Sequence, residues 1–177
     1  SSLKQVRVDM LAGKENSACS GCYREERLGL TSFRQNKNSN INEVNLDQLL
    51  NNTDANGHLN NFKIQYWDSR FSNICNFKCR TCGSGFSSQW EQEDLKNNVS
   101  YARIFPKNDN PNFLQEIVDQ VPNFKTAYFA GGEPLITEEH YILLEEMIRT
   151  KKSETVRLRY NTNMSNLKFK NKDFTNL

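Results

Sequence analysis

The pattern of apolar and polar positions predicts a helix at the start of the chain, followed by a more polar stretch. Leu3, Val6 and Met10 recur at helical spacing, and Gly13 follows as a C-terminal stop. Residues 36–61 are rich in Asn, Asp and Ser, with one short apolar interruption. This composition predicts a linker or a loosely structured crossing.

From residue 61 onwards, strand-like and helix-like patterns alternate. Three stretches of strand-like composition predict strands: 62–68, 125–136 and 155–163. Three stretches of helix-like pattern predict helices: 87–98, 112–121 and 137–150. Asn110 and Pro111 are expected as the cap and first residue of the middle helix. Alternating strands and helices indicate parallel βα units and an α/β fold, in which ligands bind at the carboxyl ends of the strands.

Composition and charge narrow the class of protein. Of the 177 residues, 36% are apolar, and the formal net charge of +2 gives no reason to expect nucleic acid or a membrane as partner. Five cysteines are an odd number, and three of them crowd into one loop, which favours a reducing compartment and predicts a cytoplasmic protein. Because the chain begins without Met and stops soon after a strand, we expect a fragment of a longer protein.

Three cysteines follow the first predicted strand in the sequence CNFKCRTC. Cys75, Cys79 and Cys82 have C-x3-C-x2-C spacing, which suits a metal better than paired disulfides. A structural zinc usually takes four protein ligands, whereas three thiolates leave one position open, as on an iron–sulfur cube with one iron not bound by protein. The glycines that follow, Gly83 and Gly85, allow close backbone approach around a bulky cluster.

A second motif, Gly131-Gly132-Glu133-Pro134, ends the second predicted strand. The two glycines let the backbone pass close to a ligand, and the Glu133 carboxylate suits an ammonium group. The alternative is an ordinary strand-to-helix turn, in which glycines and proline are common.

The two motifs together resemble the radical S-adenosylmethionine (SAM) superfamily, over about residues 62–163. The resemblance implies a [4Fe-4S] cluster on Cys75, Cys79 and Cys82, with SAM chelated to the open iron. It further implies reductive cleavage of SAM to a 5′-deoxyadenosyl radical, an external electron donor, and an unknown substrate for which a peptide is one candidate. The implied fold is a partial parallel (β/α) barrel, truncated after about three of the usual six βα units.

The resemblance also assigns cofactor contacts. Gly131, Gly132 and Glu133 would hold the amino group of the methionine moiety, and Pro134 would fix the turn. Thr81 stands where the family often has an aromatic wall of the adenine site.

Asn163, at the end of the third strand, is expected either to contact the ribose hydroxyls or to serve as a turn former.

Cys19 and Cys22 form a separate C-x2-C pair whose surroundings resemble the end of a SPASM or twitch module, which holds an auxiliary iron–sulfur cluster. The other cysteines of such a module are not in this sequence. The pair therefore predicts two ligands of an incomplete auxiliary site, or alternatively free or redox thiols. The expected organisation is a module end (1–35), a linker (36–61) and the N-terminal half of a radical SAM core (62–177).

Two functions follow from these patterns. The first is a radical SAM enzyme, of which this chain assembles the cluster but turns over weakly or not at all. The second is a non-catalytic zinc or iron–sulfur binding module, with a zinc site completed by Cys19 or Cys22. The two histidines, His58 and His140, are expected to be solvated residues.

Overall fold

The computed structural model describes residues 2–39, 46–100 and 110–177, and the chain divides into two compact units, Ser1–Phe62 and Lys63–Leu177. Each unit is described by itself. No helix in the described ranges is long and apolar enough to span a membrane.

The first unit is helical. Its helices are α1 (Leu3–Leu11), the 3-10 turn η1 (Ser17–Cys19), α2 (Ser20–Arg27), α3 (Phe33–Ser39) and α4 (Leu46–Asn52). The predicted first helix is confirmed, with the Ser2 hydroxyl accepting from the Gln5 backbone N–H at its start. No side chain of α1 is fully buried, so apolar packing of this helix is limited. Polar contacts therefore contribute to holding the unit together.

Residues after α4 pack directly on α1. Gly57 has a φ of 75°, and a Cβ at this position would lie 2.2 Å from the Lys4 carbonyl oxygen. The Arg7 guanidinium donates to the Gly57 carbonyl at 2.9 Å. The stretch 36–61, expected to be a linker, thus includes a helix and a tight backbone contact, while 40–45 lie outside the described residues.

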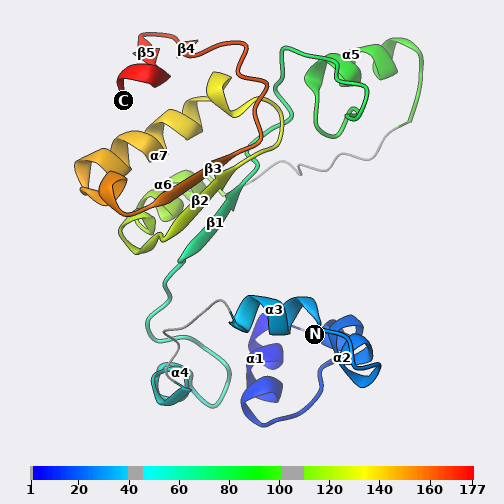
Figure 1. The fold of residues 1–177 in the computed structure, drawn as a ribbon, viewed down its shortest axis with the longest axis vertical. Helices are drawn as coiled ribbons and strands as arrows, with labels where there is room; N and C mark the ends of the chain where they lie inside the picture. Colours follow the sequence, from blue (N-terminus) through cyan, green and yellow to red (C-terminus); the bar gives the residue numbers. More distant parts are fainter. Residues whose placement is uncertain (1, 40–45, 101–109) are drawn as a thin grey trace. The chain divides into compact units, whose positions relative to one another are not determined.

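The second unit is mixed α/β (Figure 1). Its strands are β1 (Tyr66–Ser69), β2 (Thr126–Phe129), β3 (Arg157–Tyr160) and a small antiparallel pair, β4 (Lys168–Phe169) and β5 (Lys172–Asp173). Its α-helices are α5 (Ser88–Lys96), α6 (Phe113–Val118) and α7 (Glu138–Arg149). Four 3-10 turns complete it: η2 (Val121–Asn123), η3 (Pro134–Ile136), η4 (Lys152–Glu154) and η5 (Phe174–Asn176).

The predicted α/β class and parallel strands are confirmed. β1, β2 and β3 form an open sheet in that order, with Tyr66, Thr126 and Arg157 in register. The described strands do not close into a barrel. The expectation that Pro111 begins the middle helix is wrong, because α6 starts at Phe113.

Helices α6 and α7 cover one face of the sheet (Figure 1). Along β2, Ala127 and Phe129 are buried, whereas Thr126 and Tyr128 on the opposite face are only half-buried. The core beneath the helices is apolar: Ile117, Val121, Phe124, Ala127, Phe129, Leu143, Leu144 and Met147. Burying this face supplies the main hydrophobic stabilisation of the unit.

His140 of α7 lies inside this packing, so the expectation that it is solvated is wrong. Its side chain is fully buried, its Nε2 lies 3.0 Å from the Tyr160 hydroxyl, and its Nδ1 has no hydrogen-bond partner among the described residues. The ring packs edge-on against Phe129 and Tyr141. Burial lowers the pKa of His140 to about 4.

The buried histidine predicts loss of stability in mild acid. Because the pKa of His140 is lower in the folded than in the unfolded chain, its contribution is complete above about pH 6.5 and is lost as the pH falls towards 4. The full shift corresponds to roughly 3 kcal/mol. Denaturant unfolding between pH 7 and 5 should show a shallower pH dependence for His140→Gln than for the wild type. The exposed His58→Gln is the control, and equal slopes in all three proteins would contradict the assignment.

Candidate functional site

The ends of the three parallel strands meet at one edge of the sheet. The cysteine loop follows β1, the turn at Gly131 and Gly132 follows β2, and residues 161–163 follow β3. The Asn161 backbone N–H donates to the Phe129 carbonyl at 2.9 Å, which continues the pairing of β2 and β3 into the turn. As the order of elements predicts, all three motifs share the carboxyl edge.

Glu133 links these strand ends. Its side chain is 1% exposed, and its carboxylate accepts three hydrogen bonds. One oxygen accepts from the Leu135 N–H (3.1 Å) and the Thr162 hydroxyl (2.6 Å), and the other accepts from the Asn163 N–H (2.7 Å). The Glu133 carboxylate, expected to hold an ammonium group, is therefore already bound to the end of β3.

The turn after β2 also packs against the cysteine loop. The Glu133 N–H donates to the Ile74 carbonyl at 2.7 Å. A Cβ at Gly132 would lie 2.1 Å from the same oxygen, and Gly131 has a φ of 84°. A side chain at position 132 would prevent this approach, so Gly132 lets the turn pack against Ile74, the residue that precedes Cys75, while Gly131 lies against Arg70 and Ser72.

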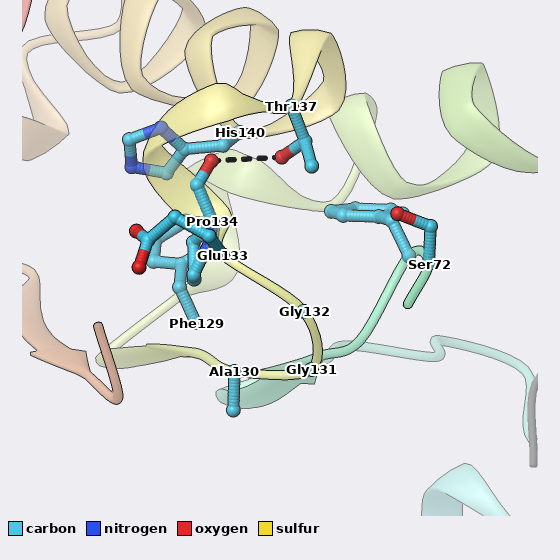
Figure 2. A pocket seen from close by; sticks show the side chains of 10 residues that line it. Ser72, Phe129, Ala130, Gly131, Gly132, Glu133, Pro134, Thr137 and His140 are labelled. Carbon is cyan, nitrogen blue, oxygen red and sulfur yellow. Dashed lines mark hydrogen bonds between the residues drawn. The ribbon is translucent and has the colours of Figure 1, made fainter. Parts of the chain in front are cut away.

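A small cavity of about 10 Å³ lies behind this turn (Figure 2). It has room for about one water molecule and is far too small for a nucleoside. Beside it, the Thr137 hydroxyl donates to the Pro134 carbonyl at 2.8 Å. A cofactor of the expected size would have to lie outside this cavity.

Side chains at the start of α5 hold the cysteine loop from a second direction. The Ser88 hydroxyl accepts from the Cys75 N–H and donates to the Cys75 carbonyl, both at 3.1 Å. The Trp90 indole N–H donates to the Cys79 carbonyl at 3.0 Å. The hydroxyl of Ser87, the α5 cap, donates to the Phe77 carbonyl at 2.7 Å. The helix thus fixes the loop backbone and leaves the sulfurs out of these bonds.

The three thiols of the loop are free and lie close together. Cys79 and Cys82 are exposed, and Cys75 is half-buried. Partial burial of its sulfur raises the pKa of Cys82, and the nearby Cys79 and Cys75 thiols raise it further. A hydrogen bond with the Thr81 side chain acts in the opposite direction on this pKa. Cys82 therefore lies within electrostatic reach of the other two thiols.

The three thiols are soft ligands, which suit either zinc or an iron–sulfur cluster. In the part of the chain that the structure describes, no three Cys, His, Asp or Glu side chains are already grouped as a metal site. The choice between a cluster and a single ion stays a prediction. A Cβ at Gly83 would meet no atom within 4 Å, so the space beside Cys82 is open.

Two other predicted residues take positions that the sequence did not specify. The exposed Thr81, expected beside adenine, lies next to the Cys82 sulfur. Asn163, expected near ribose, directs its side-chain amide to Asn76 and Cys75. Thr162 was not anticipated, and its only sequence signal is a polar side chain directly after a strand.

Cys19 and Cys22 belong to the first unit and are both half-buried and free. Cys19 caps α2 at its N-terminus and Cys22 lies in the first turn. The Arg34 guanidinium lies within electrostatic reach of Cys22 and packs over the Tyr23 ring at 4.8 Å. Both expected roles of the pair, as ligands of an auxiliary cluster or as free or redox thiols, stay predictions.

Comparison with known proteins yields no match to a family model, a curated protein or a solved structure. The function is therefore inferred from the site itself.

The close contact at Gly132 makes a first prediction for the site. Gly132→Ala places a Cβ on the Ile74 carbonyl and should cost roughly 1–3 kcal/mol of unfolding free energy, because backbone has to move. Thermal and denaturant unfolding measure this loss. Gly83→Ala, in open space, is the matched control and should leave stability nearly unchanged. Equal stability of the two variants would argue against the tight turn.

A second prediction concerns the Glu133 carboxylate. In Glu133→Gln, the new NH₂ faces either the Asn163 N–H or the Leu135 N–H, so a buried donor meets a donor whichever way the amide lies. The expected cost is roughly 1–3 kcal/mol in denaturant unfolding. Glu138→Gln removes a carboxylate from an exposed ion pair with Lys170 and should cost less than about 1 kcal/mol. A smaller loss at Glu133 than at Glu138 would overturn the assignment.

Proposed function

We propose that the chain carries part of a radical SAM enzyme, with Lys63–Leu177 supplying the first three βα units of its core. The observation that carries the proposal is the arrangement of three free thiols on one loop, packed against a double-glycine turn at the carboxyl edge of a parallel sheet. The resemblance in the two motifs supports the same function.

The two faces of the sheet support a barrel. Helices pack on one face, while the other carries polar or amphipathic side chains, including Asp68, Tyr128 and Arg159. On that face Arg70 pairs with Asp68 at 2.7 Å and lies over the Tyr128 ring. A doubly wound sheet would place helices on both faces, whereas a barrel wall has helices only outside.

The cysteines and the glycine turn would have separate roles in the site. Cys75, Cys79 and Cys82 would hold a [4Fe-4S] cluster through three irons. The bound cluster and SAM would supply one-electron cleavage of the sulfonium bond, giving methionine and a 5′-deoxyadenosyl radical. The bare backbone of Gly131 and Gly132 is the accessible contact for the methionine amino group, since Glu133 already accepts three hydrogen bonds.

Fewer residues can be assigned to adenine and to the substrate than to the cluster. Phe77 lies between two of the cysteines and is 44% exposed, which makes it available for stacking on adenine in place of an aromatic at Thr81. The peptide substrate, the external electron donor and the auxiliary cluster at Cys19 and Cys22 belong to the same proposal. They rest on the resemblance alone.

Anaerobic reconstitution with iron and sulfide tests the proposal. The wild type should bind about four irons per chain. After reduction, its electron paramagnetic resonance (EPR) signal should change when SAM is added. Cys75→Ala should lose most of this cluster, whereas Cys22→Ala should retain it. An EPR signal that does not change when SAM is added would contradict a SAM site on the cluster. A colourless protein with stoichiometric zinc would favour the non-catalytic binding module.

A further inference from the structure

The side-chain amide of Asn163 is engaged at both ends. Its Nδ2 donates to the Asn76 side-chain oxygen at 3.1 Å and lies 4.0 Å from the Cys75 sulfur. Its Oδ1 accepts from the Ser165 N–H at 2.9 Å. These contacts fix which way the amide points, so its N–H groups face the cysteine loop.

The backbone of Asn163 is anchored independently. Its N–H donates to the buried Glu133 carboxylate at 2.7 Å. On the loop side, Asn76 makes a second bond across the same gap, from its side-chain NH₂ to the Ser165 hydroxyl at 2.8 Å. The segment after β3 and the cysteine loop are therefore joined by two side-chain hydrogen bonds, one donated from each side.

The Cys75 sulfur thus has two N–H groups near it. The second is the Phe77 backbone N–H at 3.4 Å. A neutral thiol is a weak acceptor, but a thiolate attracts such donors and shortens the bond. Hydrogen bonds to cysteine sulfurs are among the features that set the reduction potential of an iron–sulfur cluster.

We propose that Asn163 is a positioning residue for the cluster: it holds the cysteine loop through Asn76 and donates an N–H to the Cys75 thiolate. The ribose contact expected at this position from the sequence stays a prediction. The inference rests on the proposed function, because it assigns the Cys75 sulfur to a cluster. Removing the donor should make the cluster harder to reduce, and a carboxylate at position 163 should do so more strongly.

The first test needs no cluster. Amide hydrogen exchange of the metal-free chain, followed by peptide mass spectrometry, should show residues 73–82 exchanging about fivefold faster in Asn163→Ala, as loss of one hydrogen bond predicts. Asn161→Ala, on the same turn, is the matched control and should resemble the wild type. Unchanged exchange in Asn163→Ala would overturn the positioning role, whatever the outcome of reconstitution.

The second test uses the reconstituted protein without SAM. The midpoint potential, titrated by EPR, should become more negative in Asn163→Ala and more negative again in Asn163→Asp, with Asn161→Ala unchanged. Asn76→Ala loosens the loop but keeps the donor, so it should move the potential less than Asn163→Ala. Identical potentials in the wild type and both Asn163 variants would overturn the donor role. Failure of the wild type to bind a cluster would instead refute the proposed function, and the donor role with it.

Discussion

The buried carboxylate of Glu133 is the interaction on which the site depends. Placing a carboxylate out of water is costly unless donors satisfy it. Here the donors come from its own turn, at Leu135, and from the end of β3, at Thr162 and Asn163. The backbone N–H of the same residue binds the cysteine loop at Ile74. One residue therefore joins the loops that follow all three parallel strands.

The order and type of these elements could be predicted because they depend on local composition. Strand-like segments around 62–68, 125–136 and 155–163 each contain or border an observed strand. Their ends could not be predicted, because Gly132 leaves the sheet to contact Ile74, a residue distant in sequence. The polar stretch 36–61 was interpreted as a linker because packing of Gly57 on α1 leaves no local signal.

The chemistry-bearing residues were easier to find than their partners. The cysteine spacing and the double glycine can be read directly from the sequence. The partners of Glu133 and Asn163 depend instead on how the strands pair in the sheet. His140 shows the same limit, because a polar residue in the first turn of a helix looks solvated until Tyr160 and Phe129 are placed beside it. Long-range pairing is the information that a single sequence lacks.

The double attachment of the cysteine loop has a consequence for how its backbone moves. The loop is held by Ser88 and Trp90 at the start of α5, and by Gly132 and Asn163 at the strand ends. Linked contacts of this kind tend to open together as one cooperative unit. The loop is therefore expected to leave its place as a whole, in a concerted fluctuation of the sheet edge, and not residue by residue.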